Sequence, residues 1–350
     1  MPFRTPFQGC AVRFSPFSEA RLAVCTAQYF GIVGNGRLHV IDALPDTGAE
    51  RFAPVAAFDT AEALFDAAWS EAHENIIATA GGDGSIRVWD VTAPPGQACV
   101  RQLHEHAREC QCVKWNILRR ELIISSSWDD TARVWEPETG ACVRVLAGHT
   151  YCVYAAQWNP RQPDVALTVS GDCTARIWDL RQPQATLTVP AAQQEILSGD
   201  WCKYNDCIFA TGSVDKAVNV WDVRLPAQPL VTLLGHGMGV RSVVFSPWSE
   251  NEILSGGYDM AVILWDVGRP QAPLVRRWTH HSEFVTGVEI STLVRGLAAS
   301  TGWDDLTHCW RLDGPGPPPV GPGAGPGPPG AVPPPGAVPP PPGMHMPLGR

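Results

Sequence analysis

An internal repeat constrains the fold of this chain more than any other feature of its sequence. Six copies end in a strand-like run that carries a tryptophan, and successive tryptophans lie 43 to 46 residues apart: Trp89, Trp135, Trp178, Trp221, Trp265 and Trp310. A seventh copy, residues 36–42, has Ile41 at the tryptophan position. The copies alternate β-branched and small residues around a tight turn, a pattern that predicts strands. Seven copies predict seven similar structural units.

Two further positions keep a fixed distance from each tryptophan. Six residues before it lies an aspartate (Asp83, Asp129, Asp172, Asp215, Asp259 and Asp304), replaced by Asn35 in the first copy. Twenty-nine residues before it lies a histidine (His106, His149, His236 and His281), replaced by Thr60 and Ala192 in two copies. This pattern resembles that of the WD-repeat family over residues 1 to about 313. The resemblance implies an all-β, seven-bladed propeller whose four-stranded blades surround a central channel.

The two ends of the chain have different predicted roles. The segment after Trp310 soon becomes rich in proline and glycine, and proline cannot donate a ladder hydrogen bond. We therefore expect residues near Phe3 to Phe7 to supply the outer strand of the last blade. Residues 1–313 are predicted to form the propeller and residues 314–350 a disordered Pro/Gly-rich tail. Its PxxP stretches leave open that it binds an aromatic-lined adaptor domain.

Composition narrows the compartment and the class of partner. The net charge is −9, which argues against a nucleic-acid partner and favours a cationic one. Eleven cysteines show no CxxC pair or disulfide-framework spacing. The sequence shows neither an amino-terminal signal peptide nor an apolar run long enough for a transmembrane segment. These features predict a cytosolic protein with reduced thiols.

Two groups of residues look like chemical sites, but the repeat explains both. Ser170, His149 and Asp172 suggest a catalytic triad, yet the same phase recurs in other copies. The family resemblance implies instead a structural hydrogen-bond network in each blade. Its expected members are His106, Asp129, Trp135, His149, Asp172, Trp178, Asp215, Trp221, His236, Asp259, Trp265, His281, Asp304 and Trp310. The segment 104–112, with two histidines and two cysteines, is interpreted as strand and core, so we expect no metal and no cofactor.

Function is expected at the positions that vary between copies. In a propeller, the residue before each turn aspartate and the start of each inner strand line one end of the channel. The residues at these positions gather aromatic rings and two carboxylates: Phe65, Glu109, Gln111, Trp128, Tyr154, Glu195, Leu197, Arg241, Tyr258, Phe284 and Trp303. Exposed rings indicate a binding surface. The set favours a peptide that has an apolar stripe and a basic residue.

Several segments resemble a narrower family, the peroxisomal import receptors for the type 2, amino-terminal targeting signal. They are residues 26–42, 65–71, 125–136, 195–206 and 280–287. The resemblance implies a receptor without enzymatic activity that cycles from the cytosol to the peroxisomal matrix. Its expected partners are cargo proteins bearing an amphipathic Arg-Leu-x5-His-Leu helix, an import co-receptor and the peroxisomal docking machinery.

On this resemblance, we expect that Glu109 or Glu195 meets the cargo arginine. Trp128, Tyr258, Phe284 and Trp303 are expected to bracket the apolar stripe. The competing hypothesis is a generic WD-repeat scaffold or a substrate adaptor, for example of a ubiquitin ligase. A propeller enzyme is a third class, which the absence of any non-repeating polar cluster disfavours.

Overall fold

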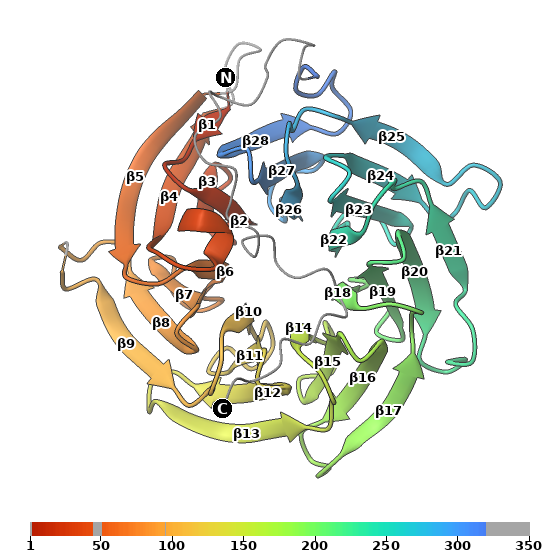
Figure 1. Ribbon diagram of the computed structural model, residues 1–350, viewed down its shortest axis with the longest axis horizontal. Helices are drawn as coiled ribbons and strands as arrows, with labels where there is room; N and C mark the ends of the chain where they lie inside the picture. The colour runs from red at the N-terminus through yellow and green to blue at the C-terminus, as the bar shows by residue number, and fades with distance from the viewer. Residues whose placement is uncertain (1, 45–50, 95, 320–350) are drawn as a thin grey trace, which may run out of the picture.

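The computed structural model describes residues 2–44, 51–94 and 96–319, and this part of the chain is almost entirely β-strand. Its strands form seven antiparallel four-stranded sheets arranged as the blades of a closed ring (Figure 1). The only helical element among the described residues is a short 3-10 turn, η1 (Gln28–Gly31). The predicted seven-bladed propeller is therefore confirmed.

Each of the first three blades places its first strand at the channel and the next three outward, in chain order. Blade 1 comprises β2 (Gln8–Phe14), β3 (Arg21–Ala27), β4 (Gly36–Leu44) and β5 (Arg51–Thr60). Blade 2 comprises β6 (Leu64–Trp69), β7 (Ile76–Gly81), β8 (Ser85–Asp90) and β9 (Cys99–His104). Blade 3 comprises β10 (Cys110–Trp115), β11 (Ile123–Ser127), β12 (Thr131–Glu136) and β13 (Ala141–Ala147).

The remaining blades follow the same plan, except that the last is completed by the start of the chain. Blade 4 comprises β14 (Val153–Trp158), β15 (Val165–Ser170), β16 (Thr174–Asp179) and β17 (Ala185–Pro190). Blade 5 comprises β18 (Ile196–Trp201), β19 (Ile208–Ser213), β20 (Ala217–Asp222) and β21 (Val231–Leu234). Blade 6 comprises β22 (Val240–Phe245), β23 (Glu252–Gly257), β24 (Val262–Asp266) and β25 (Leu274–Trp278). Blade 7 comprises β26 (Val285–Ile290), β27 (Leu297–Gly302), β28 (Leu306–Arg311) and β1 (Phe3–Arg4).

The ring closes where the two ends of the propeller sequence meet. Strand β1 pairs antiparallel with β28, with Phe3 opposite Thr307 and Arg4 opposite Leu306. The amide of Thr5 continues the contact by donating to the carbonyl of Asp305 at 2.9 Å. The expected closure is confirmed, but the strand is shorter than residues 3–7. It ends ahead of Pro6, which has no N–H to donate.

The core lies between neighbouring blades, so each sheet depends on the next for burial. One cluster joins Ala78 and Ile86 of blade 2 to Val113, Ile123 and Trp135 of blade 3. Similar clusters follow around the ring. Burial of apolar surface on both faces of every sheet is the main stabilising term.

A hydrogen-bond network recurs inside the blades that carry the histidine. In blade 3, His106 Nδ1 lies 2.8 Å from Asp129 and its Nε2 lies 2.8 Å from Ser125, whose hydroxyl also accepts from Trp135 Nε1 at 2.8 Å. Burial alone would raise the pKa of Asp129, but the hydrogen bonds from His106 and Thr131 outweigh it and hold this pKa well below its ordinary value.

Blades 4 to 7 repeat this network with two variations. The full set forms in blades 4 and 6, around His149, Asp172 and Trp178 and around His236, Asp259 and Trp265. Without the histidine, blade 5 keeps two separate bonds, from Trp221 to Thr211 and between Ser213 and Asp215.

Blade 7 differs because two histidines share one hydroxyl. Both His280 and His281 bond Ser300, at 2.9 and 2.8 Å, and His281 Nδ1 lies 2.9 Å from Asp304. The indole N–H of Trp310 has no hydrogen-bond partner among the described residues, so the structure leaves Trp310 outside the network in which the sequence places it. Its ring packs on His280 instead, 4.9 Å between centroids.

The first residues after the propeller pack on blade 6. Arg276 donates to the carbonyls of Leu312 and Pro315, at 3.4 and 3.2 Å. Gly316 has a φ of +73°, and a Cβ there would lie 2.2 Å from the indole nitrogen of Trp278, so only glycine fits. The segment predicted to be disordered from residue 314 thus begins with a fixed contact. Residues 320–350 of the predicted tail lie outside the described residues.

Candidate functional site: the rim and mouth of the channel

One backbone hydrogen bond sets the rim of the channel in blades 2 to 7. The residue before each turn aspartate donates its N–H to the carbonyl of the residue just before the inner strand. These pairs are Gly82–Ala63, Trp128–Glu109, Gly171–Cys152, Val214–Glu195, Tyr258–Gly239 and Trp303–Phe284, all at 2.8 to 3.0 Å. The bond needs no particular side chain, so these positions are free to vary and can carry a ligand surface.

The next residue layer points into the channel because every inner strand contains a β-bulge. The register of each inner strand skips one residue at its start: Cys10, Phe65, Gln111, Tyr154, Leu197, Arg241 and Thr286. A bulge leaves a residue out of the ladder and re-aims its side chain. All seven bulge residues line a cavity of about 470 Å³ in the channel.

The predicted set is therefore divided between two levels. Glu109, Trp128, Glu195, Tyr258, Phe284 and Trp303 lie on the rim, and Phe65, Gln111, Tyr154, Leu197 and Arg241 lie in the mouth of the channel. Gln111 and Leu197 are only 6% exposed, so they are walls of the mouth rather than parts of an open face. Sequence spacing missed Cys10 because the first copy has a longer turn.

Four rings in sequential contact form an aromatic arc over blades 6, 7 and 1: Tyr258, Phe284, Trp303 and Phe30. Ring centroids lie 4.9 Å apart from Tyr258 to Phe284, 5.1 Å from Phe284 to Trp303 and 4.8 Å from Trp303 to Phe30. Aromatic pairs at such distances fix one another's orientation. Phe30 was not predicted, although the irregular turn that replaces the tight turn in the first copy was a signal.

That irregular turn is itself part of the surface. Tyr29 and Phe30 both have positive φ, 48° and 61°, which turns the chain over the rim. A Cβ on Gly31 would lie 2.5 Å from the ring of Phe65, so the turn rests on the first bulge ring of blade 2. Tyr29 and Val33 are 60% and 66% exposed. The aromatic arc is thus continuous with an exposed apolar turn.

A second group, which we call the acidic arc, extends over blades 3, 4 and 5: Glu109, Trp128, Tyr151 and Glu195. The guanidinium of Arg108 lies 5.9 Å from the Trp128 ring centroid and 3.7 Å from the Glu109 carboxylate. A Cβ on Gly171 would touch both Tyr151 and Glu195, at 2.3 and 3.2 Å, so these two side chains flank that glycine. Glu195 has no ion-pair partner in the described part of the chain, whereas Glu109 is shared with Arg108.

Two more carboxyl groups, Glu283 and Asp305, lie close in the sequence to the rim residues Phe284 and Trp303. Burial raises the pKa of Glu283 above its ordinary value, and the nearby Asp304 raises it further. Burial also raises the pKa of Asp305, where Arg4 lowers it and Asp304 raises it. The rim positions themselves contribute two carboxylates, Glu109 and Glu195, which are suited to a positively charged ligand.

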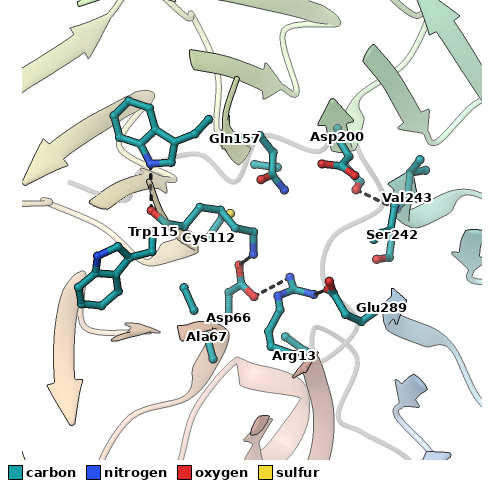
Figure 2. Close-up of a pocket in the computed structure, with 18 of the residues that line it drawn as sticks. Arg13, Asp66, Ala67, Cys112, Trp115, Gln157, Asp200, Ser242, Val243 and Glu289 are labelled. Carbon is teal, nitrogen blue, oxygen red and sulfur yellow. Dashed lines mark hydrogen bonds and ion pairs between the residues drawn. The ribbon is translucent and has the colours of Figure 1, made fainter. Parts of the chain in front are cut away.

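Deeper in the channel lies a charge cluster that sequence analysis did not predict. Figure 2 shows Arg13 between Asp66 and Glu289, with ion-pair distances of 2.7 and 3.0 Å. Asp66 also accepts from Lys114 at 2.7 Å, and Lys203 pairs with Asp200 at 2.7 Å. Arg13, Asp66, Lys114 and Glu289 come from four blades, so only the closed ring brings them together, whereas Asp200 and Lys203 both belong to blade 5. The pairs of Arg13 and Lys114 link the inner strands of neighbouring blades.

Among the described residues, one cluster of three histidines has the spacing of a metal site. The ligand nitrogens of His280, His281 and His308 lie within 4.8 Å of one another. However, both ring nitrogens of His281 are hydrogen-bonded, to Asp304 and Ser300, and His280 Nε2 also bonds Ser300. The cluster belongs to the scaffold of blade 7.

Comparison with known proteins defines the class. The WD40 family, described as "WD domain, G-beta repeat", matches residues 55–90, 97–136, 140–179 and 227–266. The WD40 β-propeller domain of Doa1 has the same fold, with a TM-score of 0.74 and 18% identity over 88% of this chain and 94% of that one. The fold and its repeats therefore define a WD-repeat propeller with an aromatic and acidic rim. No helix in the described residues is long and apolar enough to cross a membrane.

Curated relatives identify the particular family. Peroxisome biogenesis protein 7 of Arabidopsis thaliana is 60% identical over 309 residues, which cover 88% of this chain and 96% of the plant protein. The peroxisomal targeting signal 2 receptors of Dictyostelium discoideum and Homo sapiens are 43% and 42% identical over 136 and 139 residues, each 39% of this chain and 42% and 41% of those proteins. The chain belongs to the family of peroxisome biogenesis protein 7 and the peroxisomal targeting signal 2 receptors. The narrower resemblance in the sequence is confirmed.

Proposed function

We propose that this chain is an import receptor that binds the amino-terminal type 2 peroxisomal targeting signal of cargo proteins, with the form Arg-Leu-x5-His-Leu. The observation that carries the proposal is the 60% identity to peroxisome biogenesis protein 7 over 96% of that protein. The aligned 309 residues cover nearly the whole propeller, not only a few of its repeats. The proposed role is capture and delivery, not catalysis.

The chemistry of the signal matches the two arcs. In a helix, residues seven positions apart lie on the same face, so the two leucines of the signal form one stripe and the arginine and histidine lie beside it. The leucine stripe packs on the rings of the aromatic arc, where burial of each side chain contributes about 1.5–3 kcal/mol. The arginine reaches the acidic arc. This is the mode in which an amphipathic helix lies on an apolar surface.

A difference in ion pairing supports one of the two glutamates that were predicted to meet the arginine. Glu109 lies 3.7 Å from Arg108, which already offsets part of its charge. Glu195 has no such partner among the described residues and is held in place beside Tyr151. We assign the arginine to Glu195 and give Glu109 a supporting electrostatic role.

The exposed turn beside the aromatic arc supports a second partner. Tyr29, Ile32 and Val33 are 60%, 49% and 66% exposed, and they adjoin Phe30. A co-receptor that closes over the bound helix would bury them. The receptor, cargo and co-receptor then engage the peroxisomal docking machinery, and the receptor cycles between the cytosol and the peroxisomal matrix.

The test is binding of a fluorescent Arg-Leu-x5-His-Leu peptide, measured by anisotropy with and without a co-receptor fragment. The peptide with its arginine replaced by alanine is the ligand control. Glu109→Lys and Glu195→Lys place a cation beside the cargo arginine and should abolish binding, while Glu138→Lys, an exposed position away from the rim, should not change it. Equal binding of the two peptides would contradict the function. Unchanged affinity in both rim variants would contradict the site.

A further inference from the structure

The mouth of the channel holds hydrogen-bond donors that lack acceptors. Gln111 is 6% exposed, yet its amide nitrogen Nε2 has no partner among the described residues. Its side chain lies at a bulge and lines the cavity. Buried polar groups are nearly always hydrogen-bonded, and an unpaired one destabilises the folded state. This donor calls for an acceptor that enters the mouth from outside.

Arg241 adds a positive charge to the same mouth. Its guanidinium makes one long hydrogen bond, 3.4 Å to the carbonyl of Leu197, and no ion pair with any described carboxylate. Burial raises the pKa of Cys10 to about 12, and the charge of Arg241 opposes that rise. Arg241 belongs to blade 6 and Cys10 to blade 1. Both residues are bulge residues that line the cavity, so the charge of Arg241 reaches beyond its own blade.

The other cations that line the cavity do not share this property. Arg13 pairs with Asp66 and Glu289, Lys114 with Asp66, and Lys203 with Asp200. Within the described lining, Arg241 is the one cation that has no carboxylate partner. The charged groups deep in the cavity thus pair with one another. At the mouth, the Arg241 guanidinium has no carboxylate partner and the Gln111 amide nitrogen has no acceptor among the described residues.

We propose that the channel mouth is a carboxylate-binding subsite, in which the guanidinium of Arg241 supplies the charge and the amide of Gln111 a further donor. Guanidinium–carboxylate hydrogen bonds are among the strongest in proteins. Burial also raises the pKa of the Tyr154 hydroxyl, which keeps it protonated as a third possible donor.

The subsite changes what the whole surface recognises. The rim carries excess negative charge and the mouth an unpaired positive charge, so the complementary ligand is basic where it meets the rim and acidic where it enters the channel. The carboxylate comes either from an acidic side chain of a bound polypeptide or from a small free carboxylate. Only the polypeptide source rests on the proposed receptor function.

The first test uses no targeting peptide. The melting temperature of the full chain is measured in sodium propionate, with equimolar sodium chloride and propionamide as controls. At ten times its Kd, propionate should raise the melting temperature by about 2–4 °C. The rise should disappear in Arg241→Leu and Gln111→Leu and remain in Arg161→Leu, which removes an exposed cation outside the cavity lining. Arg241→Lys keeps the charge and should retain part of the rise, so the test survives misfolding of the leucine variant.

The second test distinguishes the two sources. Five Arg-Leu-x5-His-Leu peptides carry one glutamate at successive positions of the x5 segment, and each has a glutamine counterpart. A gain of about tenfold for one glutamate peptide, lost in Arg241→Leu, assigns the carboxylate to the bound polypeptide. Equal affinities with intact propionate binding assign it to a free carboxylate.

No rise in propionate, or an equal rise in Arg241→Leu, would overturn the subsite and leave the receptor function standing. Conversely, propionate binding without any binding of the targeting peptide would remove the receptor function and keep the subsite.

Discussion

The rim is built from equivalent backbone positions all the way around the ring, but its two sides carry different chemistry. In blades 6, 7 and 1 it holds four rings in sequential contact, with centroids 4.8 to 5.1 Å apart. In blades 3 to 5 it holds two glutamates, an indole and a tyrosine, and neither of these two rings contacts another described ring. A ring of similar blades does not by itself orient a ligand. On the proposed function, the difference between the two arcs orients the bound helix, with its arginine at blades 3 to 5.

The largest expected effect comes from removing the centre of the aromatic arc. Trp303→Gly deletes the ring that touches both Phe30 and Phe284, and we expect peptide affinity to fall about 100-fold, as for an aromatic hot spot. Blades 2 and 4 have glycine at this turn position, so the backbone tolerates the change. Anisotropy titration measures the affinity, and circular dichroism checks the fold. A loss under threefold would show that the aromatic arc does not bind the peptide.

The next effect sharpens the contrast between the two glutamates. Glu195→Gln should weaken peptide binding about tenfold. Glu109→Gln should weaken it only about threefold, because Arg108 already offsets part of the Glu109 charge. The Glu195 effect should shrink as sodium chloride rises from 50 to 500 mM, since salt screens a partly exposed ion pair. Isothermal titration calorimetry at both salt concentrations gives the comparison. The reverse order of the two variants would assign the arginine to Glu109.

A smaller effect is expected at the indole of the acidic arc. Trp128→Gly removes a ring that contacts Arg108 but no other described ring, and affinity should fall about fivefold. The matched residue is Trp303, at the same turn position in blade 7. If the two tryptophan variants lose equal affinity, the arcs are not functionally distinct.

The smallest effect on binding is expected from the scaffold networks, which lie under both arcs. Asp129 and Asp172 have pKa values held below the ordinary value, so their stabilisation is complete above about pH 5 and is lost progressively as pH falls through the unfolded pKa of about 3.9 and toward the folded pKa values. Urea denaturation should show a falling free energy of unfolding from pH 5 to pH 3. Asp172→Asn should flatten that slope while leaving peptide affinity at pH 7 within twofold. A variant with changed affinity but unchanged stability would place this network in the site.

The scaffold could be predicted because its constraints are local and repeated. The spacing of Asp129, His106 and Trp135 predicts one hydrogen-bond network. Its recurrence in blades 4 and 6 predicts the propeller of similar blades. Even the closing strand followed from the proline-rich segment after Trp310. The same argument failed at Trp310 itself, because His280 adds a second ring to the hydroxyl that the indole would use.

The candidate site was less predictable, because the spacing of residues in the sequence reveals neither how deeply a side chain is buried in the channel nor which blades contact one another. The copies located Gln111 and Leu197 at the channel end, but only the bulges show that they point inward and are buried. Phe30 escaped because the first copy replaces the tight turn with an irregular one. Arg13, Asp66 and Glu289 belong to three blades, and no local pattern marks them as partners.

The pairing of β1 with β28 has a consequence for synthesis of the protein. Arg4 of the closing strand leaves the ribosome long before its partner Leu306, which is 302 residues later in the sequence. At about 5–20 residues per second, the amino-terminal strand waits roughly 15–60 seconds for its partner. During that interval the strands of the first six blades are synthesised, whereas β28, the strand with which β1 pairs, is not. A fusion or deletion at the amino terminus therefore acts on the last step of ring assembly, not the first.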